Sequence, residues 1–96
     1  MTVVNKRTHT PTANDMYIGR GSILGNPYRI GYGFNREEAI KAYEKYARKR
    51  IANDPEFRRA IAGTKDKTLV CFCKPLACHG DVIEQLEREL SDEPYV

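Results

Sequence analysis

The stretch Thr68-Leu69-Val70-Cys71-Phe72-Cys73 decides the fold, because it predicts a β-strand better than any other part of the chain. Its β-branched and aromatic side chains follow a polar turn at residues 65–67, a pattern typical of a strand. Beyond it, apolar residues recur at helical spacing at Val82, Ile83, Leu86 and Leu90. We therefore expect a strand that leads through a short loop into an amphipathic helix.

Two helices are predicted before this strand. The first covers Asn35–Ile51 and begins with a capping box, in which Asn35 is the cap and Glu38 lies three residues later. The second begins at Asp54, has a proline at its first helical position, and ends near Gly63. The first helix carries an apolar stripe that we expect to be buried, made up of Ile40, Tyr43, Ala47 and Ile51.

Short apolar runs at Thr2-Val3-Val4 and Met16-Tyr17-Ile18 indicate two further strands. The order of strands and helices predicts a small single α/β domain, with a short, mostly parallel sheet, about three helices and a Rossmann-like order. With 96 residues the chain can form one core, so residues 1–90 are expected to be that domain and residues 91–96 a frayed tail. The chain has neither the roughly 18–20 consecutive apolar residues of a membrane span nor a secretory signal, so we expect it in the cytoplasm.

The charge of the chain is distributed unevenly. The net charge of +3 is too small to argue for a nucleic-acid partner by itself. Residues 1–50, however, contribute +6 and residues 51–96 contribute −3. The basic excess peaks at residues 41–50, a run more typical of a solvated helix face than of a phosphate-binding surface.

All three cysteines lie within eight residues, at Cys71, Cys73 and Cys78. An odd, clustered set does not suit a secreted disulfide framework. Three interpretations stay open. In the first interpretation, the cysteines are small core residues. Alternatively, Cys71, Cys73 and Cys78 bind zinc together with His79. In the third, Cys78 is a catalytic or ligand-binding thiol with His79 as its base or hydrogen-bond partner.

Asp81 bears on the third interpretation. In a helix that includes Cys78, the Asp81 carboxylate would lie beside the thiol and raise its pKa. The alternative is that Asp81 caps the helix and leaves Cys78 and His79 in the preceding loop. We predict Cys78, His79 and Asp81 as catalytic residues.

A glycine-rich loop is predicted at Gly19-Arg20-Gly21-Ser22-Ile23-Leu24-Gly25-Asn26-Pro27. Glycine lets a backbone approach a ligand, and an arginine can hold a phosphate or carboxylate with two hydrogen bonds. The spacing is not that of the dinucleotide-binding fingerprint. If the strands before the two loops are parallel neighbours, both loops emerge at one sheet edge and form one pocket. The predicted ligand-binding residues are Gly19, Arg20, Gly21, Ser22, Asn26 and Lys74.

The chain also resembles a family of bacterial and phage proteins, the domain of unknown function 4326. The resemblance covers roughly residues 15–90 and rests on four motifs. They are Tyr17-Ile18-Gly19-Arg20-Gly21-Ser22, Leu24-Gly25-Asn26-Pro27, Arg36-Glu37-Glu38, and the segment from Cys71 to Asp81 with its Cys78-His79-Gly80-Asp81 end. It implies a domain and a site rather than a reaction, and it places a phage-encoded chain in the host cytoplasm.

Two functions follow from the sequence. The first is binding of a phosphorylated or nucleotide-like small molecule, with the question of turnover left open. The second is a non-enzymatic accessory domain, in which a structural zinc site or a packed cysteine cluster supports a surface that binds a host protein or nucleic acid. No cofactor is predicted under the first function, and zinc is the alternative under the second.

Overall fold

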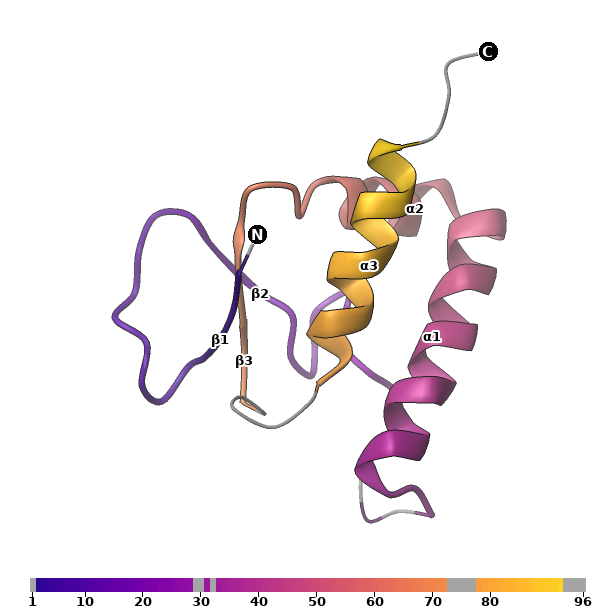
Figure 1. The fold of residues 1–96 in the computed structure, drawn as a ribbon, viewed down its shortest axis with the longest axis horizontal. Helices are drawn as coiled ribbons and strands as arrows, with labels where there is room; N and C mark the ends of the chain where they lie inside the picture. The colour runs from indigo at the N-terminus through magenta and orange to yellow at the C-terminus, as the bar shows by residue number, and fades with distance from the viewer. Residues whose placement is uncertain (1, 29–30, 32, 73–77, 93–96) are drawn as a thin grey trace.

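The structure is a computed structural model that describes residues 2–28, 31, 33–72 and 78–92. Its elements in chain order are β1 (Thr2–Asn5), β2 (Asp15–Tyr17), α1 (Arg36–Asn53), α2 (Pro55–Ala62), β3 (Thr68–Cys71) and α3 (His79–Ser91). The strands form one sheet in the order β1-β3-β2, and β3 pairs in parallel with both neighbours. The small α/β fold with a parallel sheet is therefore confirmed (Figure 1), and the strand predicted from residue 68 onward is the central one.

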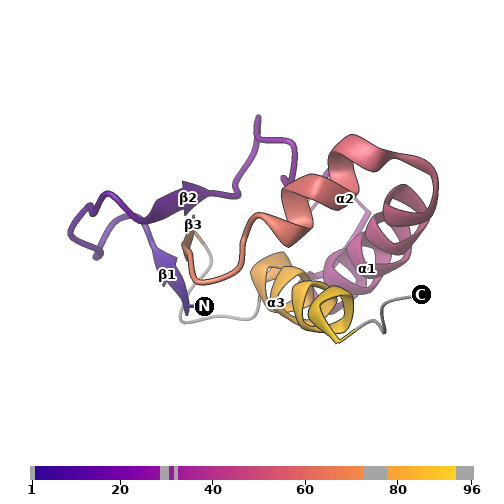
Figure 2. The same cartoon turned by 90° about the horizontal axis from the view of Figure 1, so that it is seen from above.

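The pairing register separates the two faces of the sheet. Val3, Leu69 and Met16 share one row; Leu69 belongs to the core, and the other two pack against it. The next row lies on the opposite face, because successive side chains of a strand alternate. All three helices lie to the same side of the sheet in the view from above (Figure 2).

The helices begin where their caps place them. Asn35 and Glu38 form the predicted capping box at the start of α1. Asp54 caps α2 by accepting hydrogen bonds from the backbone N–H groups of Glu56 and Phe57. In the predicted stripe of α1, Tyr43 and Ala47 are buried, whereas Ile40 and Ile51 are partly buried. The predicted packing face of α1 is correct, and the helix ends two residues beyond the predicted boundary.

The core lies between the sheet and the helices. Its largest fully buried side chains include Tyr43 from α1, Phe57 and Ile61 from α2, Leu69 from β3 and Ile83 from α3. Ile18, just after β2, is also fully buried, and its N–H donates to the Val70 carbonyl although β2 ends at Tyr17.

Two predicted boundaries differ in the structure: the end of the central strand and the start of the C-terminal tail. β3 ends at Cys71, while Phe72 is 48% exposed and Cys73 lies outside the described residues. Of the predicted tail, Ser91 completes α3, Asp92 is its C-cap, and residues 93–96 lie outside the described residues. Within the described part of the chain, no helix is long and apolar enough to cross a membrane.

Candidate functional site

Cys78 is the N-cap of α3. Its Sγ atom accepts a hydrogen bond from the Gly80 N–H at 3.1 Å, and the Asp81 carboxylate accepts one from the Cys78 N–H at 3.2 Å. These residues form a capping box in which a thiol takes the place of the usual hydroxyl. Asp81 therefore lies in the first turn, and the alternative in which Asp81 itself caps the helix is wrong.

Gly80 explains why α3 approaches the sheet so closely. A Cβ atom at this position would lie 2.8 Å from a methyl group of Val3 and 3.0 Å from one of Ile18. Only glycine leaves room for the first turn of α3 to pack directly on the sheet.

Cys78 also contacts the end of β3. Its Sγ atom lies 3.4 Å from that of Cys71, and the two residues are 2% and 1% exposed. Both are free thiols. In the described residues, no group of three or more His, Cys, Asp or Glu side chains could hold a metal ion. Cys73, which the zinc interpretation requires, and Lys74 lie outside those residues, so the zinc site stays a prediction.

His79 joins the start of α3 to the glycine-rich loop. Its ring is buried, and Nε2 lies 2.7 Å from the carbonyl oxygen of Ile18. Because a carbonyl oxygen only accepts, Nε2 carries the proton. Burial lowers the pKa of His79, partly opposed by the carbonyls of Ile18 and Leu24 and by the Asp81 carboxylate. We infer a neutral imidazole that holds the loop in place.

The loop after β2 folds as two consecutive tight turns. The backbone N–H of Ser22 donates to the Gly19 carbonyl at 3.1 Å, and that of Gly25 donates to the Ser22 carbonyl at 3.0 Å. The Ser22 hydroxyl donates to the Gly19 carbonyl as well, at 2.7 Å. Gly21 has a φ of +93°, a conformation that other residues rarely adopt, and a Cβ atom at Gly25 would lie 2.6 Å from the Gly19 oxygen. The glycines are thus required by the shape of the loop.

The far end of the loop is held by α1. The Tyr43 hydroxyl, which is buried, donates to the Leu24 carbonyl at 2.8 Å. The Asn26 amide donates to the Ala39 carbonyl at 3.2 Å and its oxygen accepts from the Tyr28 N–H at 2.8 Å. Asn26, predicted to bind the ligand, therefore uses both ends of its side chain to position the backbone.

A pocket of about 370 Å³ opens between this loop and α1. Its lining consists of Arg20, Gly21, Ser22, Ile23, Gly25, Asn26, Pro27, Tyr46 and Arg50. Four of the predicted ligand-binding residues are in this lining; Gly19, Cys78 and His79 are not. The predicted site residues thus fall into two groups. Four from the loop line the pocket, whereas Cys78 and His79 are buried and do not line it. The catalytic roles of Cys78, His79 and Asp81 stay predictions.

Tyr46 and Arg50 line the pocket but lie outside the glycine-rich loop from which the sequence predicts ligand-binding residues. Arg50 lies in the basic run that was assigned to a solvated face. In the structure its guanidinium donates to the Asp54 carboxylate at 2.6 Å and to the Tyr46 hydroxyl at 2.5 Å, and it lies 4.7 Å from the centre of the Phe57 ring. A signal was present in the sequence, because Tyr46, Arg50 and Asp54 are four residues apart and therefore share a helix face.

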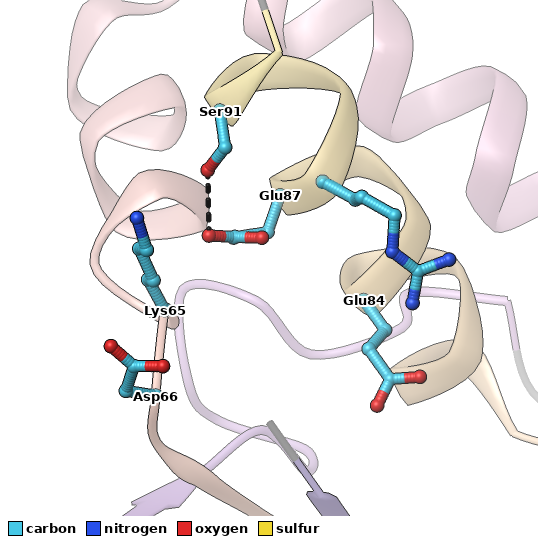
Figure 3. Close-up of a pocket in the computed structure, with 6 residues that line it drawn as sticks. Lys65, Asp66, Glu84, Glu87 and Ser91 are labelled. Atoms are coloured by element: carbon cyan, nitrogen blue, oxygen red, sulfur yellow. Dashed lines mark hydrogen bonds between the residues drawn. The ribbon is translucent and has the colours of Figure 1, made fainter.

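A second hollow, of about 220 Å³, lies near the C-terminal end of α3 and contains none of the predicted site residues. Glu87 is buried there and accepts a hydrogen bond from the Ser91 hydroxyl at 2.9 Å, while Lys65 and Asp66 line the other side (Figure 3). Its side chains carry charges of both signs, so the lining favours neither an anionic nor a cationic ligand.

Comparison with known proteins identifies the same family that the motifs of the loop and of the α3 start indicate. The family model named domain of unknown function (DUF4326) matches residues 3–89. The chain belongs to this family. It is also 31% identical over 81 residues to the "uncharacterized 12.4 kDa protein in nrdA-td intergenic region" of Enterobacteria phage T4, a match covering 84% of this chain and 74% of the phage protein. No solved structure matches this DUF4326 chain.

Proposed function

We propose that this DUF4326 domain binds a small anionic molecule, phosphorylated or nucleotide-like, in the pocket between the loop and α1. The observation that carries the proposal is Arg20. It is exposed, lines the pocket, and makes no ion pair with any described residue. An arginine held on a tight glycine loop, without an ion pair to the described residues, is suited to a phosphate or carboxylate.

The remaining lining fits the same ligand class. Gly21 adds no side chain, so a phosphate could approach the backbone closely. Arg50 adds a second positive charge, although its pairing with Asp54 reduces the net contribution. The volume of about 370 Å³ lies within the roughly 300–1,000 Å³ range of small-molecule sites.

The loop is preorganised for binding. His79 holds the Ile18 carbonyl before the loop, and Tyr43 holds the Leu24 carbonyl near its end. A loop that is already ordered loses less conformational entropy when a ligand binds. Under this proposal His79 and Cys78 support the site from beneath, and any turnover would require Cys78 to reach the ligand.

Arg20→Ala tests the proposal. Titration calorimetry with pyrophosphate and with adenosine monophosphate should show affinity falling by about 1.5–3 kcal/mol, the range for a hydrogen bond to a charged group. Arg59→Ala is the matched control, because it removes an exposed arginine that does not line the pocket. Equal binding by the wild-type protein and Arg20→Ala, or no binding of either probe, would contradict the proposal.

A second variant separates binding from chemistry. Cys78→Ala leaves every lining residue of the pocket in place, so binding should stay largely intact. If turnover of a phosphorylated substrate is found in the wild-type protein, its loss in this variant, with ligand affinity and fold retained, would support a chemical role for Cys78.

A further inference from the structure

The face of the sheet that turns away from the helices ends in two exposed aromatic rings. Val4, Val70 and Tyr17 share the row that follows the core-facing row, so they lie on this outer face. Phe72, two residues after Val70, lies on the same face, and its ring is 6.3 Å from that of Tyr17. Tyr17 is 40% exposed and Phe72 is 48% exposed.

Two cations lie against these rings. The Lys6 ammonium is 5.5 Å from the centre of the Tyr17 ring and 5.8 Å from that of Phe72, and the Arg7 guanidinium is 5.8 Å from the Phe72 ring. The backbone holds this arrangement, because the Lys6 N–H donates to the Cys71 carbonyl at 2.7 Å and the Asn5 amide donates to the Phe72 carbonyl at 3.2 Å. Lys6, Arg7, Tyr17 and Phe72 together are called the aromatic platform below.

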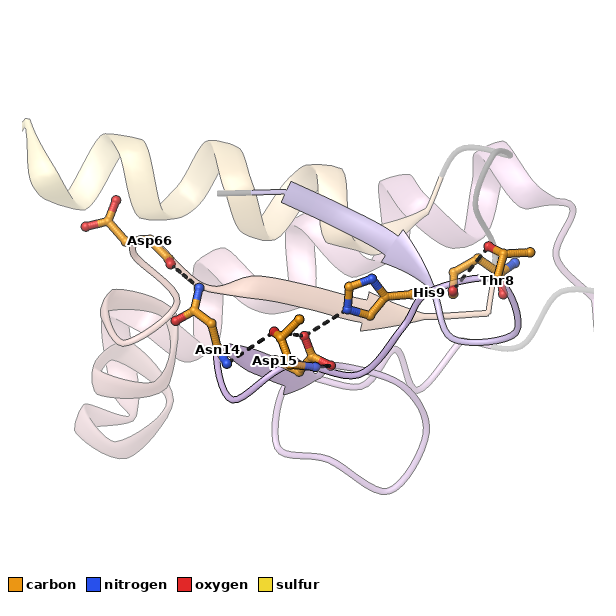
Figure 4. Close-up of polar contacts among 7 residues, drawn as sticks. Thr8, His9, Asn14, Asp15 and Asp66 are labelled. Atoms are coloured by element: carbon orange, nitrogen blue, oxygen red, sulfur yellow. Dashed lines mark hydrogen bonds and ion pairs between the residues drawn. The ribbon is translucent and has the colours of Figure 1, made fainter.

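The neighbouring carboxylate is already occupied. Asp15 begins β2 and lies two residues from Tyr17, on the same face of the strand. It accepts a hydrogen bond from His9 at 2.9 Å (Figure 4). It also accepts one from the Thr12 hydroxyl at 2.8 Å and one from the Thr12 N–H at 3.1 Å. The bond from His9 is the main cause that lowers the pKa of Asp15. Asp15 is thus engaged with the loop after β1, whereas Lys6 and Arg7 lie over the two rings.

We propose that the aromatic platform binds single-stranded nucleic acid, with bases stacked on Tyr17 and Phe72 and phosphates paired with Lys6 and Arg7. Exposed aromatic rings interleaved with cations are the combination that such strands require, because every base offers a flat face and every linkage a negative charge. The two ring centres are 6.3 Å apart and the rings are 78° from parallel. Bases stacked in a duplex strand are about 3.4 Å apart, so the platform suits splayed, unpaired bases.

The platform is separate from the pocket of the proposed function. None of its four residues lines that pocket, and Tyr17 and Phe72 lie on the sheet face turned away from the helices. The Tyr17 side chain lies against Gly19 at the start of the glycine-rich loop, but the two sites use different residues to contact a ligand, so each proposal is tested by its own variants.

Fluorescence anisotropy with a labelled oligothymidylate of about ten nucleotides tests the platform. Binding is expected at low salt, with an affinity that falls as salt rises, with a logarithmic slope of about −1.4 for two phosphate contacts. Tyr17→Ala and Phe72→Ala should each weaken binding by about fivefold or more, while Tyr17→Phe and Phe72→Tyr, which keep the ring, should retain it. Since the replaced side chains are exposed, circular dichroism should show all four variants folded.

Matched charge variants make the test sharper. Lys6→Ala should reduce the salt slope to about −0.7, because one phosphate contact is lost. Lys65→Ala removes the same charge at the opposite end of β3 and should leave the slope unchanged. Arg20→Ala should also leave oligonucleotide binding unchanged.

The platform proposal would be overturned if the oligothymidylate did not bind, or if a double-stranded DNA of the same length bound with equal affinity. It would also be overturned if thymidine monophosphate competed with an affinity equal to that of the oligonucleotide, or if Tyr17→Ala and Phe72→Ala bound as tightly as the wild-type protein. Loss of oligonucleotide binding in Arg20→Ala would place the strand in the pocket instead.

Discussion

At the scale of single residues, His79 shows how one side chain couples a helix start to a loop. It is the first residue of α3, is buried against Tyr43 at a ring distance of 4.9 Å, and donates to the carbonyl that precedes the glycine loop. A charged imidazole there would lack the hydration it has in water, which is why burial lowers its pKa. The unfolded chain therefore takes up a proton more readily than the folded one.

This difference predicts an acid-sensitive stability. The part of the unfolding free energy that depends on neutral His79 is fully present above the ordinary histidine pKa of 6.5 and is lost as the pH falls below it. Urea unfolding from about pH 7 to about pH 5 should show this loss in the wild-type protein. His79→Gln keeps an N–H donor but does not titrate, so its stability should fall less over the same range. An equal fall in both proteins would refute the assignment.

At the scale of elements, Asp54 is shared by two helices. One carboxylate oxygen caps α2 through the Glu56 and Phe57 N–H groups, and the other pairs with Arg50 in the last turn of α1. The hydrogen bond from the Arg50 guanidinium lowers the pKa of Asp54. Arg50 also lines the candidate pocket. The junction between α1 and α2 therefore also orients a pocket residue.

The two caps should differ in their effect when they are removed. Asn35→Ala removes the capping box of α1 and should lower the unfolding free energy by about 1 kcal/mol. Asp54→Ala should cost more, because it removes a cap and also leaves Arg50 without its carboxylate partner. Chemical denaturation of both variants measures the order, and a smaller loss for Asp54→Ala than for Asn35→Ala would contradict the prediction.

At the scale of the whole molecule, the sheet carries the core on one face, and the aromatic platform lies on the other face, at the ends of β1, β2 and β3. Leu69 is 0% exposed and Phe72 is 48% exposed, although only two residues separate them. The sheet has only three strands, and its central strand pairs with both of the others. A cavity left by a truncated core side chain of this strand therefore lies in the one core of the domain.

Truncations at Leu69 in β3 and at Phe72 just after it should therefore have unequal effects. Leu69→Ala should cost about 2–5 kcal/mol, which approaches the roughly 5–15 kcal/mol total stability of a typical domain. Phe72→Ala should change stability little, because its side chain is half exposed. Thermal unfolding of the two variants is the measurement, and a large loss in Phe72→Ala would mean that its ring belongs to the core.

The sequence by itself determined the elements of the fold. The capping box at Asn35, the Asp54 cap and the Tyr43–Ala47 face of α1 were predictable, because caps and helical periodicity depend on residues a few positions apart. The parallel order followed from the alternation of strands and helices. The glycine loop and the Cys78–His79 pair were predicted as parts of one site for the same reason, since neighbouring parallel strands end at the same edge.

Only the tertiary structure decided how these parts are used. A cysteine or histidine at a helix start is compatible with solvent or with the core, and the choice depends on which element covers it. Here Tyr43 and Cys71 cover the α3 start, so Cys78 and His79 are buried beneath the loop. Packing likewise brought Arg50 to the pocket and left Tyr17 and Phe72 exposed. The physical reason is that burial is a property of pairs of surfaces distant in the chain, whereas a sequence pattern describes one surface at a time.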